Sequence, residues 1–151
     1  APIGAGAPGR KYEQKYGAQG GRLLRHSSFR DDLTNLYVRT ETVQDPAKAA
    51  ALAQYVRLWA RAQAWIETHR EEFARGYYQG NQGLSAEDAD YVVAAAGEAE
   101  VPATWAEALR LQQGSINLLA ARNGQRVFNA ADLFDRRFET IAARAYAEAL
   151  R

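Results

Sequence analysis

The sequence predicts a mostly α-helical protein with a few short strands. Two long segments carry apolar residues at helical spacing and begin at recognisable helix-start signals. Only two short stretches have the composition of strands, residues 22–25 and 36–39. The chain of 151 residues, with 47% hydrophobic and 25% charged residues, suffices for one hydrophobic core.

The residue counts exclude several kinds of chemistry. The chain has no cysteine, so a disulfide, a cysteine-ligated zinc ion and a cysteine nucleophile are excluded within it. Its net charge of +1 gives little attraction for nucleic acid, and we expect no nucleic-acid partner. Since methionine is absent even from position 1, we expect Ala1 to lie within a longer or processed polypeptide.

The first part of the chain is predicted to be irregular. Residues 1–20 are rich in glycine and proline at their start, which predicts a flexible lead-in. The two strand candidates follow, Arg22–Arg25 and Leu36–Arg39, with a loop between them.

Helical periodicity begins at Asp45. Asp45 and Pro46 fit the N-cap and the first position of a helix that we expect to run to about His69, with a second helix near residues 70–78. Ser85–Asp88 resembles a capping box and predicts a helix to about Ala96. Thr104–Glu107 predicts another, to about Arg122, closed by Asn123 and Gly124. A last amphipathic helix is expected from Arg136 to the end.

No set of side chains forms a complete catalytic or metal site in the sequence. The two histidines, His26 and His69, are far apart and lack ligand-like partners, so we interpret them as structural. The acidic groups 71–72 and 87–90 lie where first turns of helices favour acids. We therefore predict no cofactor, no metal and no enzymatic activity for this chain.

Arg57 and Arg61 indicate a solvated face or a docking face for an acidic partner.

The order of several segments resembles a known family. The segments that carry the resemblance are, in order, Gly20–Leu24, Asn35–Arg39, Val43–Pro46, Ala62–Ile66, Gly83–Ser85, Gln112–Gln113 and the ending Asp132–Phe138. In this order they resemble the C-terminal part of ABC-transporter solute-binding proteins of the aliphatic sulfonate, taurine and nitrate type, over roughly residues 18–141.

This resemblance implies the C-terminal part of an α/β periplasmic-binding-protein (type II) clamshell. Residues 21–44 would be the end of the second lobe and the crossover strands, with the crossing itself at about residues 28–39. Residues 45–151 would be the helical C-terminal part of the first lobe. The family's N-terminal lobe is missing from the sequence. Of this chain, Ser27, Ser28, Thr34 and Asn35 would fall where the crossover faces the ligand, with hydroxyl and amide groups suited to an anionic oxygen. Ordinary loop hydrogen bonding explains these four residues equally well.

The resemblance implies a binding component of an importer. Its partners would be a small sulfonate-like anion, a membrane ABC permease and the missing N-terminal lobe. The protein would lie in the periplasm or outside the cell, and the full-length form could carry a lipid anchor. One alternative is part of a clamshell enzyme such as a sulfinate desulfinase, whose cysteine would have to lie outside this chain. Another is a free-standing helical interaction module.

Overall fold

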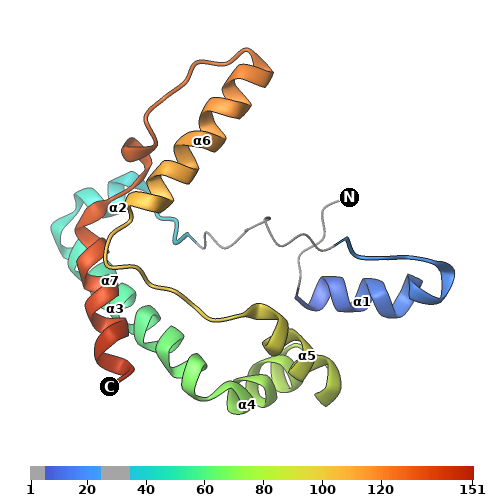
Figure 1. Ribbon diagram of the computed structural model, residues 1–151. Helices are drawn as coiled ribbons and strands as arrows, with labels where there is room; N and C mark the ends of the chain where they lie inside the picture. The colour runs from blue at the N-terminus through green and yellow to red at the C-terminus, as the bar shows by residue number, and fades with distance from the viewer. Residues whose placement is uncertain (1–5, 25–34) are drawn as a thin grey trace. The chain divides into compact units, whose positions relative to one another are not determined.

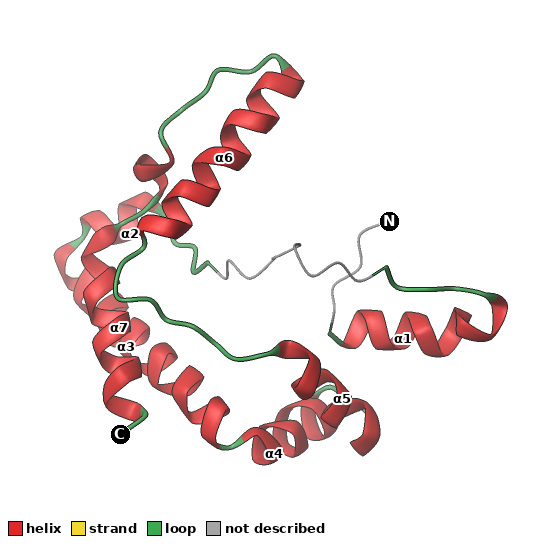
Figure 2. Ribbon diagram, in the orientation of Figure 1, coloured by secondary structure: helices red, strands yellow, loops and turns green. Residues whose placement is uncertain are grey.

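The computed structural model describes residues 6–24 and 35–151, and all regular secondary structure in these ranges is helical (Figure 2). The predicted helical character is confirmed. The predicted strands are wrong wherever they are described, since residues 22–24 and 36–39 are irregular chain. A strand needs a hydrogen-bonded neighbour, and the described residues supply none; Tyr37, for example, is 89% exposed.

Figure 1 labels the α-helices of the described chain. They are α1 (Ala7–Tyr16), α2 (Thr40–Gln44), α3 (Pro46–Thr68), α4 (Arg70–Phe73), α5 (Ala86–Ala96), α6 (Ala106–Asn123) and α7 (Glu139–Ala149). Helical segments of other types are the 3₁₀ helices η1 (Gly17–Gln19), η3 (Ala130–Leu133) and η4 (Arg136–Phe138) and the π-helix η2 (Ala74–Asn81). The chain forms two compact units, unit 1 from Ala1–Asp31 and Trp65–Ala99, and unit 2 from Asp32–Ala64 and Glu100–Arg151.

Unit 1 corrects the prediction of an irregular lead-in, because α1 occupies residues 7–16 of it. Proline in the first turn is compatible with a helix, and the glycines stop before a run of good helix formers. Polar contacts with α5 then hold α1: Arg10 Nε donates to Asp88 Oδ1 at 2.8 Å, and Gln14 Nε2 donates to the same oxygen at 2.7 Å. The Arg10 guanidinium also lies 4.7 Å from the ring centre of Tyr91.

The predicted helix near residues 70–78 forms as α4 followed by the π-helix η2, which extends to Asn81. The wider helical turn is seen where the Gln82 N–H donates to the Tyr77 carbonyl at 2.9 Å, five residues back. Phe73 and Tyr77 stack with ring centres 5.3 Å apart. The sequence shows the aromatic residues, but not this rare helical geometry.

Unit 2 has its core between α3 and α7. Val56 and Ala60 of α3 are buried with Ala142 and Ala145 of α7, and larger side chains such as Trp59 pack around them. Because alanine carries only a methyl group, most of the fully buried side chains in this seam are small. The apolar residues at helical spacing that predicted α3 are thus only partly inward: Val56 and Trp59 contact this core, whereas Tyr55, Leu58 and Trp65 are exposed.

The helix ends test the capping predictions. Asp45 Oδ1 accepts the backbone N–H groups of Ala47 and Lys48 at 2.9 and 3.1 Å, which confirms it as the cap of α3. Ser85 Oγ likewise accepts the Asp88 N–H at 3.1 Å. The predicted capping box at residues 104–107 is wrong, because α6 begins at Ala106 after Trp105 without a side-chain cap.

The C-terminal end of α6 follows the prediction. Gly124 adopts the left-handed conformation, with φ of 63°, that glycine tolerates without steric cost. Beyond Gly124, residues 128–130 bind to the side chain of Gln113 on α6. Gln113 Oε1 accepts the Ala130 N–H at 2.8 Å, and Gln113 Nε2 donates to the Phe128 carbonyl at 3.1 Å. Gln113 therefore interrupts the apolar pattern of α6 because it binds backbone.

Candidate functional site

The predicted ligand-facing residues are only partly described. Ser27, Ser28 and Thr34 lie outside the described residues. Asn35 is partly buried, and its side-chain amide lies 3.5 Å from the hydroxyl of Tyr37, to which it donates. Of the four predicted residues, only Asn35 is therefore described, and the predicted site stays a prediction.

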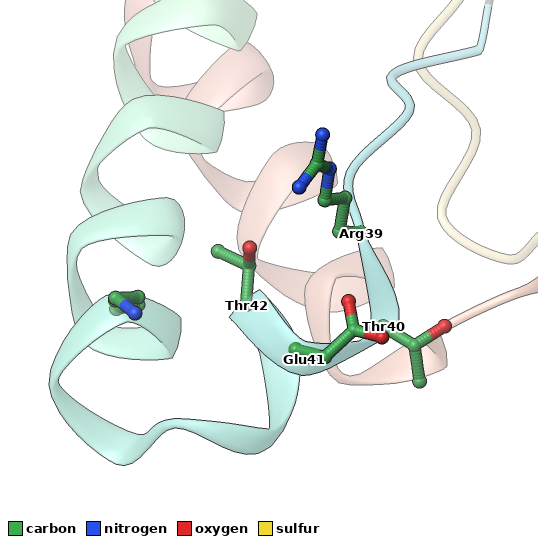
Figure 3. Close-up of a pocket in the computed structure, with 5 residues that line it drawn as sticks. Arg39, Thr40, Glu41 and Thr42 are labelled. Carbon is green, nitrogen blue, oxygen red and sulfur yellow. The ribbon is translucent and has the colours of Figure 1, made fainter.

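A polar hollow lies a few residues further along the chain, where α2 begins. It is an open surface depression of about 660 Å³, lined by Arg39, Thr40, Glu41, Thr42 and Lys48 (Figure 3). The Arg39 backbone is extended and precedes the five residues of α2, so consecutive side chains of this turn are presented around the hollow. All five belong to unit 2.

The hollow combines positive charge with hydroxyl groups. Arg39 and Lys48 supply the charge, and Glu41 opposes it. Figure 3 shows Thr42 on the same side of the turn as the Arg39 guanidinium, while Thr40 extends to the other side. The two hydroxyls therefore do not converge on one point. The arrangement suits loose binding of a hydrated anion and not a tight cage.

Lys48 is held in place from the neighbouring helix cap. Its Nζ lies 3.4 Å from Asp45 Oδ2. The pKa of Asp45 is lowered mainly by the hydrogen bond that its carboxylate accepts from the Lys48 backbone N–H. A hydrogen bond from the Lys48 side chain lowers it further. Asp45 thus stays ionised and keeps the lysine beside the hollow.

The segment Asp132–Phe138 contacts α2 through Arg137. Arg137 Nη2 donates to the carbonyl of Val43 at 2.9 Å, near the C-terminal end of α2. The guanidinium is oriented by Asp135, which accepts its Nε at 2.8 Å and so raises the pKa of Arg137. A positive charge is favourable at this end of a helix. The motif Asp132–Phe138 is therefore joined by direct contact to the segment that forms the hollow.

The residue that follows this motif, Glu139, joins the start of α6 to Arg136. Glu139, at the start of α7, accepts the backbone N–H of Trp105 through Oε1 at 2.6 Å and Arg136 Nε through Oε2 at 2.7 Å. These bonds, with one from the Thr104 side chain, lower the pKa of Glu139 to about 2 although burial opposes the charge. Trp105 also meets Phe134 edge to face, with ring centres 6.2 Å apart. Glu139 thus replaces the cap that Thr104 was predicted to provide for α6.

The remaining candidate groups have structural partners. Arg10 pairs with Asp88, and its Nη2 also lies 3.1 Å from Glu87 Oε1. His69 stacks on Trp65 with ring centres 4.8 Å apart, and its Nδ1 is 2.8 Å from Thr68 Oγ1. Across residues 6–24 and 35–151, no group of three acidic or histidine side chains is close enough to hold a metal ion. Within the same ranges, no helix has the length and apolar character needed to cross a membrane.

Sequence reasoning missed the residues that line the hollow. A signal was present, since Arg39 is followed by two threonines at alternating positions and Lys48 comes one turn after a helix cap. Residues 36–39 were interpreted as a strand, which would have pointed these side chains to opposite faces of a sheet.

Comparison of the chain with protein-family models, with curated proteins and with solved structures finds no match.

Proposed function

We propose that the chain forms the helical C-terminal part of the first lobe of an ABC-transporter solute-binding protein for aliphatic sulfonates or similar small anions. The observation that carries this proposal is the ordered series of family-like segments that ends in Asp132–Phe138. In support, Arg137 of this ending bonds to Val43, which follows the proposed crossover. Two distant segments of the series are thus in contact.

The chemistry of unit 2 is compatible with an anionic ligand. Arg39, Thr42 and Lys48 border one hollow, and the proposed crossover leads directly into it. In a clamshell protein the ligand is bound between two lobes that close over it, and no covalent bond is made or broken. This chain would contribute support for the crossover and positive charge near it, while the upstream lobe supplies other contacts. The closed form would then dock on a membrane permease.

The exposed leucines of α6 support the existence of a further polypeptide that covers them. Leu118 and Leu119 are 69% and 56% exposed, and Leu111 is also exposed on the same helix. Neighbouring exposed leucines on one helix commonly mark a surface that packs against another part of a protein. In the proposal, that part is the N-terminal lobe.

The test is ligand binding by the full-length polypeptide that the gene encodes. Titration calorimetry with taurine, longer alkanesulfonates and nitrate should give saturable heat with at least one of them, and a carboxylate of equal length should bind more weakly. Arg39→Ala should weaken binding, whereas Arg126→Ala, an exposed arginine outside the hollow, should not. If no anion of this set binds, the transport proposal fails.

The exposed leucines also favour a second candidate, a free-standing helical interaction module. The isolated chain would then unfold cooperatively as a monomer. A chain that is molten or aggregates when isolated would support the larger clamshell instead. The desulfinase alternative requires a cysteine in the cleft of the full-length protein and turnover of an aryl sulfinate.

A further inference from the structure

The α3 helix has a second apolar face, separate from the one that packs against α7. Tyr55, Leu58 and Ala62 are spaced at i, i+3 and i+7, and all three are exposed. The side chains of Tyr55 and Leu58 are 54% and 64% exposed. The inward face, with Val56 and Ala60, is already buried. A helix covered on one side and apolar on the other has more apolar surface than its own unit needs.

The charges beside this second face have one sign. Before its last turn, α3 carries three charged residues, all basic: Lys48, Arg57 and Arg61. Its acidic residue, Glu67, lies in the last turn. Arg57 and Arg61 are one turn apart, where like charges slightly destabilise a helix. Both are exposed, and no ion pair to either is seen within the described chain. Solvated helix faces usually alternate charges, so this pattern is unusual for a face that only contacts water.

We propose that the outer face of α3, defined as Tyr55, Arg57, Leu58, Arg61 and Ala62, docks an acidic amphipathic helix of a partner protein. Spacing of i, i+3 and i+7 is the pattern by which helices bind one another. Arg57 and Arg61 are one turn apart and lie on the same side of Leu58, so they would pair with aspartate or glutamate along one edge of the partner's apolar residues. A second copy of this chain would instead bring arginine against arginine. Charge complementarity therefore selects an acidic partner.

The first experiment uses the whole chain and a synthetic helical peptide of about 20 residues, long enough to form a helix with stabilising pairs. The acidic probe has leucine at i, i+3 and i+7 and glutamate at the flanking positions. Its twin has lysine in place of each glutamate. Fluorescence anisotropy should show that the acidic probe binds at least about tenfold more tightly than the lysine twin. The difference should shrink in about 1 M salt, where charges are screened within about 3 Å.

Matched variants locate the binding to this face. Arg57→Glu with Arg61→Glu should weaken binding of the acidic probe by at least about tenfold and strengthen binding of the lysine twin. The same change of charge at Arg126 and Arg151, which are exposed elsewhere in unit 2, should leave both affinities unchanged. Leu58→Ala should weaken binding, whereas Leu118→Ala on α6 should not. Circular dichroism of each variant checks that the helices remain.

Three results would overturn the proposal. The first is equal affinity for the acidic and lysine probes. The second is an unchanged affinity after the double charge reversal at Arg57 and Arg61, with the helices intact. The third is self-association of the chain in sedimentation equilibrium that Leu58→Ala abolishes, because the face would then bind a second copy.

Discussion

Glu139 is a buried carboxylate, 6% exposed, whose oxygens bind the start of another helix and a neighbouring arginine. Arg136 is the largest cause of its low pKa, followed by bonds from Thr104 and Trp105 that act against the effect of burial. Removal of this carboxylate would leave the part-buried N–H of Trp105 without its acceptor, which costs more than the bond itself contributes. The residue therefore couples the N-terminal ends of α6 and α7.

We expect Glu139→Gln to destabilise the chain at neutral pH by about 1 to 2 kcal/mol, because the neutral amide loses the charge-assisted bond with Arg136. The pKa of Glu139 falls from 4.5 to about 2 on folding, so its ionised form stabilises the fold above pH 4.5. That stabilisation is lost as the pH falls through the folded value. The stability difference between the parent chain and the variant should therefore shrink between pH 4.5 and about 2. Urea unfolding at several pH values measures it.

Glu148→Gln, an exposed change on the same helix, is the control for this measurement. It should alter the unfolding free energy by less than about 0.5 kcal/mol at neutral pH. A Glu139→Gln difference that stays constant from neutral to acid pH would contradict the assigned role of the charge.

Arg137 joins the C-terminal motif to α2 through a backbone carbonyl. We expect Arg137→Ala to affect α2 locally, because the five residues of that helix have few other bonds. Amide hydrogen exchange at residues 40–44 should become at least about threefold faster, while global stability changes by less than about 1 kcal/mol. Arg126→Ala should leave this exchange unchanged. An unaltered exchange rate in Arg137→Ala would show that the bond to Val43 does not hold α2.

At the scale of the element, α6 contains two glycines with opposite requirements. Gly124 ends the helix with φ of 63°, whereas Gly114 is inside it with no atom within 4 Å of where a Cβ would lie. Gly124→Ala should destabilise the chain by about 1 kcal/mol, since other residues rarely adopt a left-handed conformation. Gly114→Ala should stabilise it by about 0.5 to 1 kcal/mol, because alanine loses less backbone freedom in a helix.

Thermal and urea unfolding of the two variants, measured side by side, checks this pair. Both changes add one methyl group to the same helix, so their chemistry is matched and only the backbone conformation differs. Two shifts of the same sign would contradict the assignment of the end of α6.

Prediction from the sequence succeeded for elements whose signals are local. The start of α3 at Asp45 and Pro46 and the end of α6 at Gly124 depend on a few adjacent residues, and the structure has both. It failed where distant contacts decide. The helix α1 is held by Asp88, and the cap of α6 comes from Glu139, each more than 30 residues away. Periodicity also cannot identify the π-helix η2, because its eight residues are too few to reveal the wider turn that i→i+5 hydrogen bonds produce.

The candidate site was predictable only in its general position. The predicted residue Asn35 lies just before the hollow, but the side chains that line it were assigned to a strand and the next helix start. Residues 36–39 have the composition of a strand, yet strand formation depends on a neighbour that the sequence pattern does not reveal. The short helix α2 has no amphipathic period long enough to detect.

At the scale of the whole molecule, both units bury small side chains. The largest fully buried residue among those described is Val92, and much of the remaining core is alanine. Many larger apolar residues, such as Leu58 and Leu118, are exposed. Since apolar burial is the main favourable contribution to folding, this distribution indicates that further stabilisation is available when these side chains become covered.

We expect Leu118→Ser with Leu119→Ser to reduce aggregation of the isolated chain without a large loss of stability. The two side chains are mostly exposed, so their removal should change the unfolding free energy by less than about 1 kcal/mol. Turbidity on heating should appear later, because a contiguous apolar patch is removed. The comparison variant is Leu109→Ser, which lies on the more buried side of α6 and should destabilise the chain. A loss above about 2 kcal/mol in the double variant would mean that α6 packs differently.

The alanine seam between α3 and α7 has a consequence for how the gene can change. A single nucleotide change in an alanine codon gives valine, threonine, serine, proline, aspartate, glutamate or glycine. At Ala60, Ala142 or Ala145, each of these overfills the seam, introduces a polar group or disturbs a helix. We therefore expect substitutions to accumulate slowly along this seam and faster at exposed positions. Natural variants of the protein should differ least where their side chains are smallest.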